Sequence, residues 1–480
     1  MTSPTPAAAA LRSDFRHLID GELFDSAQHF EVINPALGQP FALAPAASRG
    51  QLDQAVAAAR RAAPAWRARS WEERRALIGR LAELLSQHQD ELAELLTREQ
   101  GKPVGQSREE IVRAGTQSVG MSQIAIPVET LVDEPQRHIE LRYVPLGVVG
   151  IITPWNAPIN LAAGPLAAAL YTGNTVVLKP SPFTPLCCLK LGELLREAVP
   201  AGVINIVAGG DELGQWMTEH PGIDKISFTG SVATGKKVMA SAAGTLKRIT
   251  LELGGNDAAL VLDDVDPAVV APKLFFAATV NSGQVCMAIK RIYAQARIHD
   301  ALCTALVAEA RKARLGDGLA PGTTLGPIQN RRQYEKVLAI IDDARQRGAH
   351  FLCGGTPVPG PGYFIEPAIV TDCPPQARLV QEEQFGPVVP VMKFHDVEQA
   401  LHDANDTRFG LAGSVWSADV ARASEIAARL EVGTAWINQH RATAANVPFG
   451  GAKESGMGRH YSILGLKSNM EARVISVLRG

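Results

Sequence analysis

Apolar residues recur at two different spacings in the first part of this 480-residue chain. Between residues 51 and 98, alanines and leucines return every three or four positions, which predicts helices with one buried face. Segment 138–152 first alternates apolar and polar residues and then becomes wholly apolar, as expected of a strand that enters a core.

Further along the chain, short apolar runs alternate with amphipathic stretches. In the first series we expect strands over 175–178, 203–207, 226–228 and 249–252, and helices over 184–198 and 232–243. In the second series we expect helices near 266–281 and 301–313, and strands near 365–371, 387–394 and 411–416. Such alternation is typical of parallel sheets covered by helices. We therefore expect an α/β protein with two domains that meet near Gly254 and Gly255.

Composition and charge restrict the class of partner. Hydrophobic residues make up 46% and charged residues 20%, and the net charge is −2, which gives no reason to expect a nucleic-acid or anionic-membrane partner. No apolar run approaches 18 residues, so no membrane span is expected. Residues 1–10 lack a basic start and a long apolar stretch, and we interpret them as a tail rather than a signal peptide.

Six cysteines are scattered through the chain without a C-x-x-C pair, so neither a thiol redox motif nor a zinc ribbon is expected, and no metal site is predicted. This low density suits a reducing compartment, and the expected location is the cytoplasm.

Three polar residues at the ends of apolar segments are candidates for chemistry. Cys286 follows a helical stretch and a glycine, where a thiolate could act as a nucleophile, although a lone cysteine is more often a small buried hydrophobe. Glu252 ends a strand beside two glycines and could act as a base or simply be a surface carboxylate. Asn156 stands between two prolines and could stabilise an oxyanion or cap its own turn.

Residues 230–237 (GSVATGKK) join a strand to a helix and come close to a phosphate-binding loop. The last position is Lys237 where a P-loop has Ser or Thr, so no hydroxyl is left to hold magnesium and a P-loop nucleotidase is not expected. The helix N-terminus can still bind a phosphate group. No G-x-G-x-x-G fingerprint is present in the chain.

Taken in order, the segments TPWN, LKPS, FTGS-x-x-x-G, LELGGN, GQ-x-C, EE-x-FGPV and PFGG-x-K-x-SG resemble the NAD(P)-dependent aldehyde dehydrogenase superfamily, from about Asp20 to Val477. The resemblance implies a Rossmann-type dinucleotide-binding domain (1–123 and 146–254), a second α/β, catalytic domain (255–455), and a small β oligomerisation flap with a C-terminal tail (124–145 and 456–480). A homodimer or homotetramer acting on a small-molecule aldehyde is expected.

The resemblance also implies residue roles. Cys286 matches the nucleophile, Glu252 the base toward water, and Asn156 the oxyanion donor. Further matches are Lys179 for the adenosine ribose, Ser231 for the pyrophosphate, Glu383 for the nicotinamide ribose and Phe385 beside the nicotinamide. The cofactor site is completed by Trp155, Ser181, Gly209, Gly230, Leu253 and Gly254. Residues 448–451 and Lys453 match a structural signature near the active site.

Two departures from the family pattern bear on specificity. Many NAD-preferring members have a glutamate three residues after the lysine that matches Lys179, whereas this chain has Pro182, so NAD is expected with NADP use left open. Around the substrate, Asn160 lies on a small-sided wall, and Arg441, with His440, occupies the mouth loop. We predict that these residues favour an aldehyde with a distal carboxylate or polar group; the alternative is a solvated rim charge.

Two other functions fit the same fold. In a CoA-acylating aldehyde dehydrogenase, CoA replaces water as the acyl acceptor, and Glu252 argues against this because such members generally lack the hydrolytic glutamate. A catalytically silent structural protein is the second alternative. The presence of Cys286, Glu252 and Asn156 together argues against it.

Overall fold

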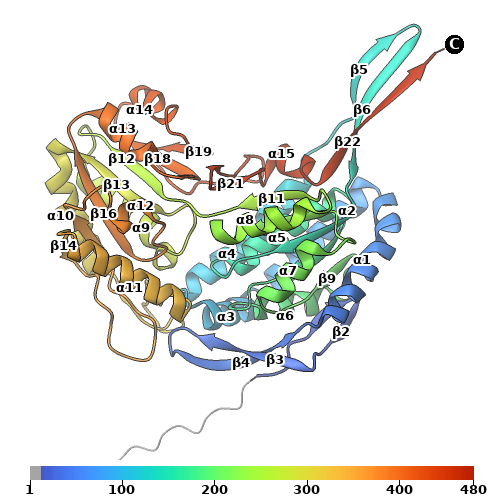
Figure 1. The fold of residues 1–480 in the computed structure, drawn as a ribbon, viewed down its shortest axis with the longest axis horizontal. Helices are drawn as coiled ribbons and strands as arrows, with labels where there is room; N and C mark the ends of the chain where they lie inside the picture. Colours follow the sequence, from blue (N-terminus) through green and yellow to red (C-terminus); the bar gives the residue numbers. More distant parts are fainter. Residues whose placement is uncertain (1–11, 480) are drawn as a thin grey trace, which may run out of the picture.

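The computed structural model describes residues 12–479, and the predicted tail at residues 1–10 lies outside this part. Figure 1 shows two lobes, each built on one sheet, and a narrow β arm that projects away from the larger lobe. No helix in the described part of the chain is long and apolar enough to cross a membrane.

The first sheet has eight strands, of which the central five run parallel. In spatial order they are β2 (Glu22–Phe24), β1 (His17–Ile19), β9 (Ile204–Ile206), β8 (Thr175–Lys179), β7 (Val148–Ile152), β10 (Lys225–Thr229), β11 (Arg248–Glu252) and β21 (Gly456–Met457). Successive strand residues face opposite sides. Val149 and Ile151 therefore join one core cluster, while Val148 and Ile152 join the other.

Helices cover both faces of this sheet. One face packs against α2 (Trp71–Gln87), α3 (Gln89–Gln100), α4 (Val104–Ser122), α5 (Pro158–Tyr171) and α6 (Leu186–Leu195). The other face packs against α1 (Arg49–Ala68), α7 (Asp211–Glu219) and α8 (Val232–Ala243).

The second sheet has seven strands, and only β14 is antiparallel to its neighbour. In spatial order they are β14 (His350–Cys353), β15 (Ala368–Thr371), β16 (Val388–Phe394), β13 (Ile289–Gln295), β12 (Asp257–Val261), β18 (Ala412–Trp416) and β19 (Thr434–Ile437). The helices of this lobe are α9 (Pro267–Thr279), α10 (Ala296–Lys312), α11 (Arg331–Gln346), α12 (Arg378–Gln381), α13 (Val397–Asn405) and α14 (Val420–Ala427). The chain passes from the first sheet to the second between Glu252 and Asp257.

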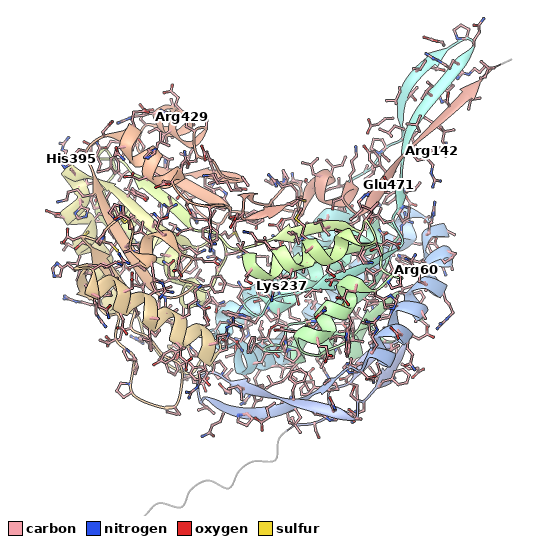
Figure 2. The ribbon with its side chains drawn as sticks, in the orientation of Figure 1. Arg60, Arg142, Lys237, His395, Arg429 and Glu471 are labelled. Carbon is pink, nitrogen blue, oxygen red and sulfur yellow. The ribbon has the colours of Figure 1, made fainter. Side chains whose placement is uncertain are left out.

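Three antiparallel strands form the arm: β5 (Glu129–Glu134), β6 (Arg137–Pro145) and β22 (Met470–Leu478), in the spatial order β22-β6-β5. Arg142 lies along the arm and Glu471 near its base (Figure 2), where the Glu471 carboxylate accepts from the Arg248 guanidinium at 2.9 Å. Two smaller pairs complete the fold: β3 (Gln28–Asn34) with β4 (Gln39–Ala46), and β17 (Phe409–Gly410) with β20 (Ala452–Lys453).

The α/β class with parallel sheets is as expected, and the helical region 51–98 consists of three helices. Not all of segment 456–480 lies in the arm. Strand β21 pairs with β11 in the first sheet, and the helix α15 (Ser462–Lys467) contacts α5. The early strands β1 to β4 were not predicted, because three of them mix exposed and buried positions without regular alternation.

Candidate functional site

Cys286 lies on a tightly turned segment that follows α9 and the short 3₁₀ helix η1 (Val280–Gly283). Asn281, Ser282 and Gly283 all have positive φ (52°, 53° and 76°), which reverses the chain sharply before the cysteine. Only glycine fits at position 283, since a side chain there would collide with the backbone of Gly386. Burial raises the pKa of the Cys286 thiol to about 12, and Lys290 opposes this shift. The thiol is therefore neutral at rest and needs a base.

Asn156 is buried between the end of β7 and the start of α5. Its side-chain amide donates to the Gln284 carbonyl oxygen at 2.9 Å, which places it against the segment that carries Cys286. The amide nitrogen carries two hydrogens, so one N–H remains for an oxyanion. The Asn156 backbone carbonyl accepts from Lys102 Nζ at 2.8 Å and from Asn281 Nδ2 at 3.0 Å. Asn156 is thus fixed at both its backbone and its side chain.

Glu252 is the last residue of β11 and is only 5% exposed. Neither of its carboxyl oxygens has a hydrogen-bond partner among residues 12–479. Burial raises its pKa well above the usual 4.5, opposed by Arg459. Gly450 allows close approach, because a Cβ there would lie 2.8 Å from Glu252 Oε1. A buried carboxyl with free lone pairs can accept a proton from water.

The segment after Glu252 connects this carboxyl to the cysteine loop. A Cβ on Gly255 would lie 2.5 Å from the Cys286 carbonyl oxygen, so the glycine permits the two segments to touch. Ser455 Oγ donates to the Gly254 carbonyl at 2.6 Å, and Leu253 N–H donates to the Ser455 carbonyl at 2.9 Å. Lys453 Nζ donates to the Asn405 carbonyl at 2.7 Å. The PFGG-x-K-x-SG segment therefore supports the site structurally.

The predicted adenosine and pyrophosphate residues lie at the carboxyl edge of the first sheet, where open α/β sheets bind ligands. Lys179 ends β8, Gly209 follows β9, and Gly230 with Ser231 follows β10. Lys179 is buried, its Nζ donates only to Pro180 O at 3.2 Å among the described residues, and burial lowers its pKa to about 8. Ser181 is buried in the turn that follows. An ammonium group with unused donors, at the same sheet edge as the N-terminus of α8, fits a dinucleotide.

The predicted nicotinamide residues connect the two lobes. Glu383 Oε1 accepts from Gly255 N–H at 3.0 Å and lies 3.8 Å from Lys290 Nζ. Burial raises the pKa of Glu383, opposed by Lys290. Phe385 has φ 52°, and its ring meets the Trp155 ring edge to face with centroids 5.3 Å apart. These residues present two aromatic rings and a carboxylate, a set suited to a planar ring and its ribose.

The three predicted substrate residues are placed differently from one another. Asn160 Oδ1 is buried without a partner among the described residues, and its backbone N–H donates to Glu110 at 3.2 Å. Arg441 lines a cavity of about 780 Å³. The His440 ring instead points into the second lobe, where Nδ1 meets Ser414 Oγ at 2.9 Å and Nε2 meets the Met287 carbonyl at 3.0 Å. With both ring nitrogens bonded, His440 holds the loop and is not free to bind an aldehyde.

Four charged residues of the site were missed from the sequence. Lys102 and Glu110 form a buried ion pair, and Lys102 Nζ donates to the Asn156 backbone carbonyl. Lys290 Nζ donates to the backbone carbonyl of Val285, the residue before Cys286. Arg113 lines the same cavity as Arg441. Lys290 is four residues after Cys286, a spacing that could have drawn attention to it. For the other three no local pattern distinguishes them from surface charges.

These features define a two-lobed α/β enzyme in which a dinucleotide-binding sheet edge faces a cysteine loop. The model of the aldehyde dehydrogenase family matches residues 24–475, and the chain belongs to this family. It is 40% identical to the putative aldehyde dehydrogenase FUS7 of Gibberella fujikuroi over 95% of this chain and 96% of that protein. It is 38% identical to the aldehyde dehydrogenase LUC3 of a Fusarium species, over 96% and 98% of the two chains.

Solved structures agree with this assignment. An NADP-dependent enzyme from E. coli superposes with a TM-score of 0.95 at 35% identity, covering 97% of this chain and 98% of that one. Betaine aldehyde dehydrogenase from Staphylococcus aureus, solved with NAD+, superposes with a TM-score of 0.94 at 33% identity, covering 97% and 95%. This protein is an NAD(P)-dependent aldehyde dehydrogenase.

Proposed function

We propose that this enzyme converts an aldehyde to a free carboxylic acid through a thioester on Cys286 that water hydrolyses. The observation that carries the proposal is the position of Glu252. Its buried carboxyl has no partner among the described residues, and the segment that follows it touches the Cys286 loop, since a Cβ on Gly255 would lie 2.5 Å from the Cys286 carbonyl oxygen. A carboxyl in this state is suited to remove protons in turn from the thiol and from water.

The Cys286 thiol loses its proton to Glu252 and adds to the carbonyl carbon, and the new oxyanion lies near Asn156 Nδ2 and the Cys286 backbone N–H. NAD(P)+, when bound, would supply the hydride acceptor for that carbon, so that a thioester of Cys286 is left. Glu252 releases the thiol proton to solvent and can then take a proton from water, which adds to the thioester. The C–S bond breaks to release the carboxylic acid, and the proton on Glu252 passes to the Cys286 sulfur, so that one proton is released overall. The cofactor would be held by residues at the edge of the first sheet and between the lobes: Trp155, Lys179, Ser181, Gly209, Gly230, Ser231, Leu253, Gly254, Glu383 and Phe385.

The test is product identity in the wild-type enzyme. An aldehyde panel with NAD or NADP should give the free acid and the reduced cofactor in equal amounts, with no effect of added CoA. Acyl-CoA formation, or turnover only with CoA, would establish the acylating alternative. No reduced cofactor with any aldehyde would favour a silent protein.

Cofactor preference, assembly and location are part of the same proposal. We propose NAD as the preferred cofactor with NADP accepted, because Pro182 neither bonds a ribose hydroxyl nor repels a 2′-phosphate. The exposed edges of the arm support a homodimer or homotetramer. The six thiols are all free in the structure, which suits the cytoplasm.

A further inference from the structure

A cavity of about 780 Å³ opens between α4 and the loop that follows β19. Residues 441–445 form one wall and residues of α4 the other. Gln117 joins the walls, since its Nε2 donates to Thr443 Oγ1 at 3.1 Å and its Oε1 accepts from Tyr461 Oη at 3.0 Å. A Cβ on Gly120 would lie only 2.7 Å from Ala445 Cβ, so the loop packs tightly on the helix. The cavity therefore has a fixed shape.

This cavity adjoins the chemistry. Tyr461, whose hydroxyl bonds to Gln117, has its pKa raised to about 12 by burial, with further influence from the nearby Glu252 and Cys286. His440 and Met287, the chain neighbours of Arg441 and Cys286, are in contact, because His440 Nε2 lies 3.0 Å from the Met287 carbonyl oxygen. A molecule with its carbonyl at Cys286 would extend toward Arg441.

Two cations in the cavity wall have no charged partner. Neither Arg441 nor Arg113 takes part in an ion pair within residues 12–479, and Arg441 Nε is buried without a hydrogen-bond partner. The Arg441 guanidinium makes no hydrogen bond within residues 12–479, and its Cζ lies 5.8 Å from the centroid of the Phe276 ring, so its N–H groups can bind a ligand. Its backbone is held in the left-handed region at φ 67°. Burial lowers the Arg441 pKa to about 10, so the group is still cationic at neutral pH.

The charges of the lining favour one negative charge on the ligand. The cavity is lined by Arg108, Glu109, Arg113 and Arg441. Arg108 is already paired with Asp90 at 2.8 Å. Two arginines against one glutamate leave a net charge of +1. Arg441 is half-buried, and its Nε is buried without a hydrogen-bond partner among the described residues, so a carboxylate that accepts from its guanidinium would supply the missing partner.

We propose that Arg441 and Arg113 bind a carboxylate at the far end of the substrate, so that the preferred substrates are aldehydes carrying one carboxylate remote from the carbonyl. This inference rests on the proposed function, because it places the carbonyl at Cys286. Arg441 supplies two parallel N–H donors of its guanidinium to the carboxylate, and Arg113 adds positive charge from the opposite wall of the cavity.

The test compares aldehydes that differ only in the distal group: 4-formylbenzoate with benzaldehyde, and 5-oxopentanoate with pentanal. In the wild type, kcat/KM for the anionic member should exceed that of the neutral member by about 10- to 100-fold. Arg441→Ala should reduce this ratio toward one, Arg113→Ala should reduce it by less, and Glu109→Gln should increase it.

Arg108→Ala is the matched control, because it removes a guanidinium of the same cavity that is already paired, and the ratio should stay unchanged. Arg441→Lys keeps the positive charge but loses the paired N–H donors of the guanidinium, so it should retain part of the preference for the anionic aldehyde. As a readout with a ligand that is not itself oxidised, glutarate should inhibit benzaldehyde oxidation competitively in the wild type and much more weakly in Arg441→Ala.

Three results would overturn the inference. The first is a wild-type ratio near one with good turnover of neutral aldehydes, which leaves the proposed function intact. The second is an equal loss of kcat/KM for the anionic and the neutral aldehyde of each pair in Arg441→Ala, which would show that Arg441 supports the structure and does not bind the carboxylate. The third is a preference for phosphorylated over carboxylated aldehydes of equal length. Absence of turnover with every aldehyde would instead contradict the proposed function.

Discussion

Glu252 is buried and Cys286 is half-buried, and desolvation raises the pKa of both groups, so proton transfer at the site depends on pH in a defined direction. A base acts only when deprotonated, and the Glu252 pKa lies well above 4.5. We therefore expect steady-state turnover to fall as pH is lowered through a value well above 4.5. Glu252→Gln should reduce kcat by about 10²- to 10⁴-fold.

If thiol addition persists in Glu252→Gln, the slow step becomes thioester hydrolysis. Stopped-flow measurement should show a burst of up to one reduced cofactor per site, and mass spectrometry should find the acyl group on Cys286. Cys286→Ala is the control and should show neither. A variant that keeps the wild-type pH profile would contradict the role of Glu252 as base.

Pro182, in the turn after β8, is predicted to leave room for a 2′-phosphate beside Lys179. Pro182→Glu should lower kcat/KM for NADP by about tenfold or more, because like charges would meet, and should leave kcat/KM for NAD the same or higher. Kinetics with both cofactors checks this, and Pro182→Gln separates the charge from the shape of the side chain. An equal change for NAD and NADP would show that the turn, and not the charge, was altered.

The sequence could predict residues such as Cys286 and Asn156 because each follows an element end in a specific motif. Arg113 and Glu110 could not be predicted in this way. They are spaced on α4 like any polar face of a helix, and their meaning comes from elements distant in sequence that pack against them. For His440 the motif position predicts the substrate mouth, whereas the partners of its ring nitrogens, Ser414 and the Met287 carbonyl, could not be predicted from the sequence.

At the scale of elements, α4 holds the start of α5 and with it Asn156. Glu110 Oε1 accepts from the Ile159 backbone N–H at 3.0 Å, and Lys102 Nζ bridges Glu110 and the Asn156 carbonyl. Both charges are buried. A carboxylate that accepts from the first N–H groups of a helix caps it, and here the cap also fixes the oxyanion donor.

Removal of one partner of this pair should therefore affect both stability and rate. Lys102→Met leaves the Glu110 charge buried alone and should lower the free energy of unfolding by about 3–5 kcal/mol. The double variant Lys102→Met/Glu110→Gln should recover much of this lost stability. Its kcat should stay about tenfold below that of the wild type, because the Asn156 carbonyl is no longer held by Lys102. KM for NAD should change little.

Denaturation and steady-state kinetics on the same samples measure the two effects. Glu94→Gln, which breaks the exposed Arg98–Glu94 pair at 2.9 Å, should cost less than about 1 kcal/mol and serves as the control. If the double variant regains wild-type kcat, the pair supports the fold but does not position Asn156.

Elements were predictable where the pattern was regular over many residues. The buried strands β7 and β8 and the amphipathic α1 and α2 are of this kind. β13 was missed, because both of its faces are buried and include Lys290 and Arg291, which look like surface residues in the sequence. The burial of such charges depends on backbone carbonyls from other segments, such as Asn256 O for Arg291.

At the scale of the whole molecule, the arm has strand edges and apolar side chains that a single chain leaves uncovered. Its outer strands β5 and β22 leave their edges unpaired within the described chain. Apolar side chains on them face solvent, with Leu131 53%, Val474 60% and Leu478 83% exposed. Open strand edges with apolar residues favour association with another chain.

We therefore expect light scattering after size exclusion to give a mass that is a multiple of 51.1 kDa, at two or four chains. Val474→Asp combined with Val477→Asp should shift the enzyme to a smaller assembly, because a carboxylate in an apolar interface is costly. Val420→Asp, at a position 57% exposed on α14 in the other lobe, should leave the mass unchanged. Far-UV circular dichroism should be the same for all variants. A wild-type mass of 51.1 kDa across the accessible concentrations would show that the arm has another use.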